Sequence, residues 1–190
     1  LDALTRQEAV QAENTRAVAL LDSFVNSSSD PMFAKDMQGR YLLFNRAACA
    51  MVFYRAVREG SAHIYNAVQL AAWAPSPLPD PGEPDRMLDQ WCWVAERGGG
   101  VVGFMSLDHS GYLDMAFVLP EEMGQGTAAA LYTPLLAKAR AMGFARLTVI
   151  ASPLARPFLA KRGWVVDRPE DMPADGQIYA VFHMSLDLSD

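Results

Sequence analysis

Residues 111–143 read GYLDMAFVLPEEMGQGTAAALYTPLLAKARAMG, and this stretch decides the fold of the chain. Residues 113–119 are mostly apolar, which predicts a strand, and Pro120 ends it because proline lacks a backbone donor. A short acidic loop follows, and GQGT at residues 124–127 then opens a helical run. The first N–H groups of a helix are unpaired, and the helix dipole is positive there. A strand, a glycine-bearing turn and a helix N-terminus in this order therefore predict a site for an anionic group.

The composition is typical of a globular protein that does not bind membranes or nucleic acids. Of the 190 residues, 51% are hydrophobic, yet no apolar run reaches the roughly 20 residues that a membrane-spanning helix needs. The formal net charge of −6 argues against general nucleic-acid binding, which relies on basic surface. The polar N-terminal residues do not resemble a secretory signal, so we expect a cytoplasmic location. Cys49 and Cys92 lack metal-ligand spacing, which favours reduced core thiols and no metal site.

The charges are unevenly distributed along the chain. Residues 123–165 contain no Asp or Glu. The basic residues in this segment are Lys138, Arg140, Arg146, Arg156, Lys161 and Arg162. A basic, acid-free segment that begins at a glycine turn points to a polyanionic small ligand, although a solvated basic face explains the same pattern.

The pattern of apolar and turn residues predicts alternating helices and strands. Helices are expected at residues 4–25, 46–60, 61–72, 126–142 and 153–162. Strands are expected at residues 32–34, 41–44, 91–96, 101–107, 112–119, 147–151, 164–166 and 179–186. The apolar run at residues 147–151 predicts burial on both faces, and residues 113–119 should be its parallel neighbour because a helix connects them.

The N-terminal part resembles one known kind of domain. Residues 20–45, LLDSFVNSSSDPMFAKDMQGRYLLFN, resemble the opening of a PAS sensor domain. The resemblance covers about the first 48 residues and stops before a ligand-holding core could form. We therefore treat residues 1–45 as an incomplete PAS-like segment and residues 46–190 as the main domain.

The main domain resembles the GNAT acyl-CoA N-acyltransferase superfamily. The pyrophosphate loop of that family, Arg or Gln, two residues, Gly, one residue, Gly or Ala, is similar to MGQGTA at residues 123–128. A later family element, Asn-x-x-Ala-x-x-Phe-Tyr-x-x-x-Gly-Phe, is similar to SPLARPFLAKRGW at residues 152–164. The resemblance implies an α/β (α+β) fold, with a mixed, mostly antiparallel sheet flanked by helices and preceded here by an N-terminal helix.

The resemblance also implies a function, which is transfer of an acetyl group from acetyl-CoA to a small-molecule or peptide amine by direct attack. The implied cofactor-binding residues form two groups. The main chain of Phe117, Val118 and Leu119 would pair with the pantetheine arm. The turn and the later element supply Met123, Gly124, Gln125, Gly126, Thr127, Ala128, Ser152 and Phe158. Nearby carboxylates favour a cationic acceptor if they converge, namely Asp108, Asp114, Glu121 and Glu122.

Three positions depart from the family pattern. Met123 stands where the family prefers Arg or Gln, which removes a polar contact to the phosphates but keeps the main-chain cradle. Ser152 replaces Asn, and Leu159 replaces the Tyr that protonates the leaving thiolate. A thiolate leaves with little help from an acid, so this change weakens catalysis without excluding it. Tyr132 is a candidate replacement acid, and Tyr112 is another.

Asp114 is the first candidate for the general base, because it lies in the strand that would hold the acyl end of the ligand. Glu121 and Glu122 are second choices. An exposed carboxylate on an alternating strand is an equally good explanation of Asp114. His63 and His109 are expected at the surface.

Two other functions fit the same residues. The first is a CoA-binding module without catalysis, which the absence of the family tyrosine would allow. The second is a chimera of the PAS-like segment and the GNAT-like domain, natural or engineered. In that chimera residues 41–44 would replace the first strand of the sheet, and the N-terminal helix would pack on the sheet or form a homodimer.

Overall fold

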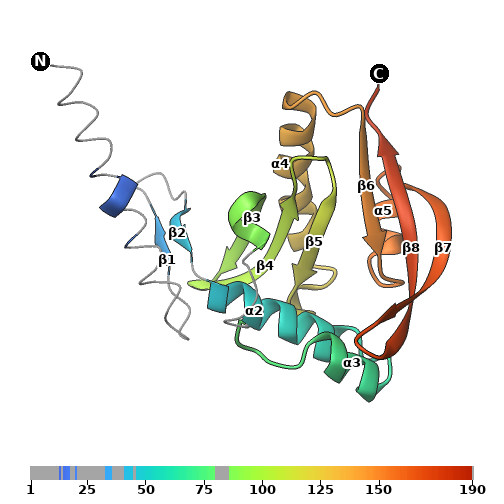
Figure 1. The fold of residues 1–190 in the computed structure, drawn as a ribbon. Helices are drawn as coiled ribbons and strands as arrows, with labels where there is room; N and C mark the ends of the chain where they lie inside the picture. Colours follow the sequence, from blue (N-terminus) through green and yellow to red (C-terminus); the bar gives the residue numbers. More distant parts are fainter. Residues whose placement is uncertain are drawn as a thin grey trace, which may run out of the picture. The chain divides into compact units, whose positions relative to one another are not determined.

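The computed structural model describes residues 13, 15–17, 20, 33–35, 41–44, 46–79 and 86–189 (Figure 1). The chain divides into two compact units, Leu1–Ala48 and Cys49–Asp190. In the first unit, β1 (Phe33–Lys35) pairs antiparallel with β2 (Tyr41–Phe44). The two short predicted strands are therefore confirmed. The PAS-like resemblance and the homodimer helix fall mostly on residues outside those described.

The expectation that residues 41–44 would serve as the first strand of the main sheet is wrong. β2 pairs with β1 in a separate two-stranded sheet. The second unit begins its own sheet at β3 (Trp91–Arg97), which is followed by β4 (Gly100–Leu107) and β5 (Leu113–Val118). These three strands form an antiparallel meander in the order β3-β4-β5, as predicted.

A second antiparallel sheet has the order β6-β8-β7 and consists of β6 (Arg146–Ala151), β7 (Val165–Ala174) and β8 (Gln177–Asp187). β7 is much longer than predicted. Pro169 and Pro173 in its sequence suggested a loop, but β7 is an edge strand, where proline costs no ladder bond. The predicted fold class, mostly antiparallel strands flanked by helices, is confirmed.

The chain passes from the first sheet to the second through α4 (Thr127–Ala141), which follows β5 and precedes β6. A single parallel bridge joins Tyr112 to Thr148, and the Thr148 N–H donates to the Gly111 carbonyl at 3.1 Å. Beyond this bridge, β5 and β6 form no further ladder in the part of the chain that the structure describes. The predicted parallel pairing is therefore present at one end only, and the β5 edge that faces β6 lacks a strand partner.

The remaining helices precede the first sheet, follow β5 or connect β6 to β7. They are α2 (Arg46–Arg55), the π-helical η1 (Ala56–Gly60), α3 (Ala67–Trp73), η2 (Arg86–Asp89), η3 (Pro120–Glu122) and α5 (Arg156–Ala160). The helix predicted at residues 61–72 begins at Ala67, six residues later than expected, because Asn66 caps it. The Asn66 side chain accepts from the N–H groups of Val68 and Gln69, at 2.9 and 3.0 Å.

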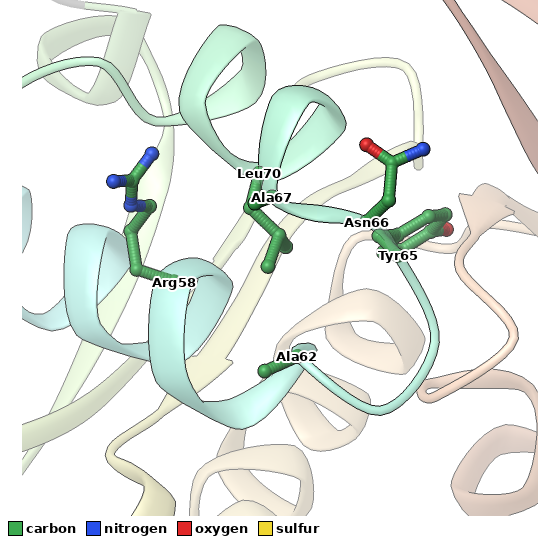
Figure 2. A pocket seen from close by; sticks show the side chains of 6 residues that line it. All are labelled: Arg58, Ala62, Tyr65, Asn66, Ala67 and Leu70. Atoms are coloured by element: carbon green, nitrogen blue, oxygen red, sulfur yellow. The ribbon is translucent and has the colours of Figure 1, made fainter.

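A surface pocket of about 370 Å³ lies between η1 and α3 (Figure 2). Figure 2 shows Arg58 and Asn66 on opposite sides of this pocket, with Leu70 between them. Three hydrogen bonds link α3 and the turn before it to β8. The Tyr179 hydroxyl donates to the Gln69 carbonyl at 2.8 Å, and the Gln69 side chain donates to the Ile178 carbonyl at 2.7 Å. The third runs from the Tyr65 hydroxyl to the Ala180 carbonyl at 3.3 Å.

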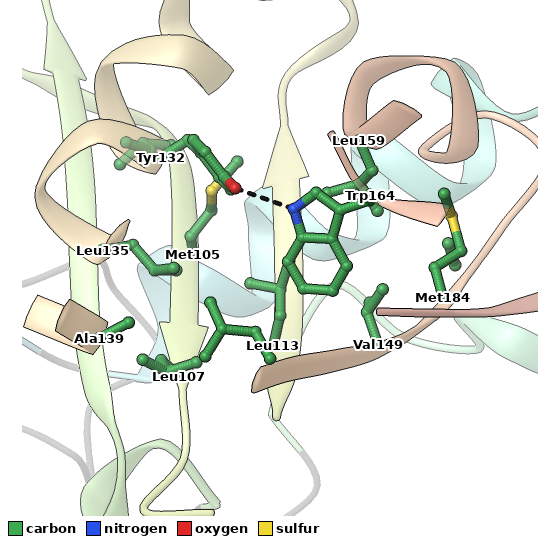
Figure 3. Packing of buried hydrophobic residues seen from close by; sticks show 13 residues of the cluster. Met105, Leu107, Leu113, Tyr132, Leu135, Ala139, Val149, Leu159, Trp164 and Met184 are labelled. Atoms are coloured by element: carbon green, nitrogen blue, oxygen red, sulfur yellow. Dashed lines mark hydrogen bonds between the residues drawn. The ribbon is translucent and has the colours of Figure 1, made fainter. Parts of the chain in front are cut away.

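The main core lies between α4 and the two sheets (Figure 3). Leu131, Leu135 and Ala139 of α4 are buried there, as predicted, whereas Met142 is 48% exposed because the helix ends at Ala141. The strands contribute Met105, Leu107, Leu113, Leu147, Val149 and Met184. β6 alternates between buried and exposed residues, so the prediction that both its faces are buried is wrong. Its exposed face lies outside the cover of α4.

Candidate active site

The turn before α4 has the backbone conformation that its glycines allow. Gly124 has φ 80° and Gly126, the residue before α4, has φ 86°. Side chains with a Cβ rarely adopt this left-handed region. A Cβ placed on either glycine would meet no atom within 4 Å. The backbone conformation therefore requires glycine, and the space in front of the turn is open to a ligand.

The N–H groups of this turn divide into used and unused donors. The Met123 N–H donates to the Pro120 carbonyl at 3.2 Å, and the Gln125 N–H donates to the Glu122 carbonyl at 3.1 Å. These two residues therefore cannot supply main-chain donors. Among the described residues, the N–H groups of Gly124 and Gly126 have no backbone acceptor.

The first turn of α4 adds further donors. Thr127 and Ala128 are its first two residues, and helix geometry leaves their N–H groups without an acceptor inside the helix. The first turn contains no acidic residue. The positive end of the helix dipole thus adds to a set of donors on one short segment, which suits an anion.

The two glutamates beside the turn are engaged with other residues. Glu122 is 6% exposed; its Oε1 lies 2.8 Å from Arg97 Nε, and its Oε2 accepts from the Thr127 hydroxyl. Glu121 accepts from Arg55 Nη1 at 2.9 Å, and this hydrogen bond lowers the pKa of Glu121. Both carboxylates are thus already paired with arginines, and their role as second-choice bases stays a prediction.

The main-chain edge of β5 is available over a shorter length than predicted. The Leu119 N–H donates to the Val102 carbonyl at 2.8 Å, and the Leu119 carbonyl accepts from Glu122 N–H at 2.9 Å. The Leu119 N–H is therefore engaged within the protein, and the pairing of Leu119 with a ligand stays a prediction. Phe117 and Val118 remain on the β5 edge, and the Phe117 ring packs on Phe53 at a centroid distance of 5.0 Å.

Asp114 lies at an irregularity in β5. Ser106 pairs with Met115 and Leu107 pairs with Leu113, so Asp114 is an extra residue in the ladder. Such bulges redirect a side chain and are common beside active sites. Gln90 Nε2 donates to Asp114 Oδ2 at 2.9 Å, and the Asp114 side chain is half-buried.

Two buried polar atoms accompany this carboxylate. Gln90 Oε1 and Ser106 Oγ have no hydrogen-bond partner in the described part of the chain. Buried polar groups are nearly always satisfied, so two exceptions on residues that adjoin Asp114 mark this end of β5 as unusual. At about 3.3 Å per residue, Asp114 lies about 16 Å from Leu119, so an extended ligand could reach from the turn to the carboxylate.

Tyr132 is part of the core (Figure 3). Its residue is 5% exposed, and its hydroxyl accepts from Trp164 Nε1 at 2.8 Å. Burial raises the pKa of Tyr132. Leu159, at the position of the family tyrosine, is 2% exposed and belongs to the same core. The role of Tyr132 as an acid stays a prediction, and its burial argues against it.

The later family element forms the start of α5. The Ser152 hydroxyl accepts from the Ala155 N–H at 3.2 Å, which holds the turn that precedes this helix. The ring centroids of Phe158 and Tyr132 are 6.0 Å apart, and the Arg162 guanidinium stacks 3.6 Å from the Phe158 ring centroid. Ser152 and Phe158 thus occupy local structural roles in addition to the predicted ligand contact.

A second pocket, of about 350 Å³, adjoins Asp114 through Gln90. It is lined by Asp89, Gln90, Asp108, His109 and Ser110. The four carboxylates that favoured a cationic acceptor do not converge, because Asp108 precedes β5 whereas Glu121 and Glu122 follow it. His63 and His109 are exposed, as predicted.

Neither pocket is lined by residues of the turn, which is consistent with a ligand held along a strand edge. Within the described ranges, no group of three His, Cys, Asp or Glu side chains could hold a metal ion. The helices of those ranges are also too short or too polar to cross a membrane.

Comparison with known proteins identifies the family. A family model described as "Acetyltransferase (GNAT) domain" matches residues 62–186. The match covers more than half of the chain, so the chain belongs to the GNAT acetyltransferase family. It is an N-acetyltransferase of the GNAT type.

Individual relatives agree with this assignment. The chain is 32% identical over 137 residues to the uncharacterized N-acetyltransferase YafP of Escherichia coli (strain K12), a match that covers 72% of this chain and 85% of that protein. It is 27% identical to a solved GCN5-related N-acetyltransferase from Rhodopseudomonas palustris, with a TM-score of 0.65 over 83% of this chain and 96% of that one. The PaiA N-acetyltransferase from Thermoplasma acidophilum is 15% identical and shares the fold, with a TM-score of 0.55 over 74% of this chain and 91% of that one.

Sequence reasoning missed two residues of this site, Gln90 and Arg97. Gln90 precedes β3 and reaches Asp114 across 24 positions of sequence. Arg97 ends β3 and reaches Glu122 across 25 positions. Neither residue belongs to a motif, so only the hairpin β3–β4 and its pairing with β5 bring them to the site.

Proposed function

We propose that this N-acetyltransferase transfers the acetyl group of acetyl-CoA to an amine by direct attack. The observation that supports the proposal most strongly is a set of main-chain N–H groups without a backbone acceptor among the described residues, beside a strand edge that leads away from them. These N–H groups belong to Gly124, Gly126, Thr127 and Ala128. The PaiA relative was solved with coenzyme A, and it shares the fold of this chain.

The cofactor fits the turn through the main chain. The N–H groups of Gly124, Gly126, Thr127 and Ala128 would hydrogen-bond the pyrophosphate, and the dipole of α4 would add to the attraction. The glycines let the phosphates approach the backbone closely. The amides of the pantetheine arm would pair along the β5 edge from Val118 toward Asp114, as a peptide pairs with a strand.

The reaction proceeds at the Asp114 end of β5. The amine nitrogen attacks the thioester carbonyl, a C–N bond forms, and the C–S bond breaks with the electron pair leaving on sulfur. Asp114 accepts the proton that the amine nitrogen loses. The departing thiolate needs little protonation, because a thiol is acidic, with an unperturbed pKa of about 8.5. The absence of an acid at Leu159 is therefore compatible with turnover.

The acceptor is an amine that enters beside Gln90. The pocket lined by Asp89 and Asp108 adjoins Asp114 through Gln90 and carries negative charge, which suits a cationic amine. Its volume of about 350 Å³ suits a small molecule or the end of a peptide.

Binding and turnover test this proposal separately. Calorimetric titration with acetyl-CoA is expected to show saturable binding at one site. Thiol release is then measured with a panel of amines that includes polyamines, amino acids and short peptides, and at least one amine is expected to release free CoA. A chain that does not bind acetyl-CoA would contradict the proposal.

The second candidate function is a CoA-binding module without catalysis. The leucine at position 159 and the burial of Tyr132 favour it, because leucine has no proton to donate and the Tyr132 hydroxyl lies in the core. Binding of acetyl-CoA without thiol release across the whole panel would favour this module over the enzyme.

A further inference from the structure

Met123 supplies no charged side-chain contact to the proposed pyrophosphate site. A Cβ added to Gly60 would lie 2.4 Å from Met123 Cε, so the Met123 side chain packs against the end of η1. The basic residues of α4 are too distant to compensate. Lys138 stands 11 residues after Thr127, about 17 Å along the helix at 1.5 Å per residue.

Arg97 is the cation that the fold brings to this turn. It is the last residue of β3 and pairs with Gly100 across the β3–β4 hairpin. This hairpin end lies beside the start of the turn, because Val102 of β4 accepts from the Leu119 N–H. Arg97 Nε lies 2.8 Å from Glu122 Oε1, one residue before Met123.

The two partners of this ion pair differ in exposure. The Glu122 side chain is 6% exposed, whereas the Arg97 side chain is 63% exposed. A buried carboxylate requires a partner, and Glu122 has two, Arg97 and the Thr127 hydroxyl. An arginine carries five N–H donors in a fixed plane, and the pair with Glu122 is made at Nε. The terminal Nη groups are left for a second acceptor on the exposed side.

Three other arginines near the turn or in the acid-free segment are already committed. Arg55 donates to both Glu59 and Glu121 and is 33% exposed. Arg156 stacks on Phe182, and Arg162 stacks on Phe158. Of the described arginines, Arg97 is thus the one that is held directly by a buried residue of the turn while most of its side chain faces solvent.

We propose that Arg97 donates through its terminal Nη groups to the pyrophosphate of the acyl-CoA. Glu122 is the positioning residue that orients Arg97 and holds the first residue of α4. This inference rests on the proposed function, because it needs CoA at the turn. A planar guanidinium suits phosphate oxygens, since it can donate two parallel hydrogen bonds.

The test compares two ligands and two arginines. Calorimetry measures the Kd of CoA and of pantetheine, which lacks the pyrophosphate, for the wild-type chain and for Arg97→Met. The variant is expected to bind CoA about tenfold more weakly, which is the loss of one charge-assisted contact, and to bind pantetheine as the wild type does. The salt dependence of CoA binding is expected to decrease.

The matched control is Arg168→Met. Arg168 lies outside the acid-free segment and has a similarly exposed side chain, at 59%, and a similar ion pair, with Glu170 at 2.6 Å. The control variant removes the same charge as Arg97→Met. It therefore distinguishes the loss of a contact at the turn from the effect of a lower net charge. Its affinity for CoA is expected to equal that of the wild type.

Glu122→Gln tests the positioning role. It keeps a side chain that can bond Thr127 but loses the charge that holds Arg97. CoA binding is expected to weaken about threefold, and the double variant Glu122→Gln/Arg97→Met is expected to bind no worse than Arg97→Met alone. Additive losses would show that Glu122 acts independently of Arg97 and would overturn its positioning role.

Two results would overturn the role of Arg97 itself. The first is a wild-type Kd for CoA in Arg97→Met. The second is an equal loss for CoA and pantetheine, which would show a structural role. If the wild-type chain does not bind CoA, the proposed function and this inference both fail, whereas wild-type binding that Arg97→Met leaves unchanged defeats the inference alone.

Discussion

At one end of β5, the turn of residues 119–128 presents main-chain N–H groups, whereas at the other end the polar groups belong to the side chains of Asp114, Gln90 and Ser106. The acidic side chains of the turn are neutralised by Arg55 and Arg97. At the Asp114 end, two buried polar atoms lack partners among the described residues. The difference indicates that the two ends of β5 have different roles. The N–H groups of the turn suit the binding of an anion, whereas the unsatisfied side-chain atoms near Asp114 suit contact with the reacting part of a ligand.

The largest effect is expected from a substitution that disrupts the turn. Gly126→Leu is expected to weaken CoA binding at least a hundredfold, because Leu is strained at φ 86° and its side chain would occupy the open space in front of the turn. Calorimetry with CoA measures the change. Gly176→Leu is the matched control, since Gly176 has φ 70° and equally open space at the β7–β8 turn. If both variants bind CoA alike, the pyrophosphate does not lie at residues 124–128.

A smaller effect is expected at the other end of β5, and it should appear in turnover alone. Asp114→Asn is expected to lower kcat about a hundredfold or more, because a positioned general base contributes on this scale, while the Kd of acetyl-CoA stays unchanged. Steady-state thiol release and calorimetry measure the two quantities. Asp175→Asn, in the β7–β8 turn, is the control. Unaltered turnover and pH dependence in Asp114→Asn would remove Asp114 from the mechanism.

The smallest effect is expected at Tyr132, which lies in α4 and belongs to neither end of β5. Tyr132→Phe is expected to lower the free energy of unfolding by about 1 kcal/mol, through loss of the hydrogen bond from Trp164, and to leave turnover unchanged. Denaturant unfolding and thiol release measure these two results. A large loss of turnover with normal stability would instead establish Tyr132 as the acid.

Tyr132 also predicts a pH dependence of stability. Burial raises the pKa of Tyr132 in the folded chain above its ordinary value of 10.0. Its contribution to stability is therefore fully present below pH 10.0 and is lost as the pH rises toward the folded pKa. The unfolding free energy of Tyr132→Phe is expected to fall less steeply above pH 10 than that of the wild type.

The sequence could predict the turn because each of its requirements is local. Gly124 and Gly126 have the left-handed φ angles that only glycine adopts freely, and a helix begins directly after them. The meander β3-β4-β5 was predictable for a similar reason, since short turns and alternating strands leave their marks within a few residues. The sequence did not reveal that the Leu119 N–H is taken by Val102, which lies 17 positions earlier in the chain.

The sequence by itself determined the family, the antiparallel meander and the glycine turn that opens α4, because backbone geometry and helix electrostatics act between neighbours in the chain. Only the tertiary structure decided which side chains serve the site. It buried Tyr132 in the core, placed Gln90 on Asp114, and brought Arg97 to Glu122. Ion pairs and hydrogen bonds between residues 24 to 32 positions apart depend on how strands pair and helices pack, and no local pattern encodes that arrangement.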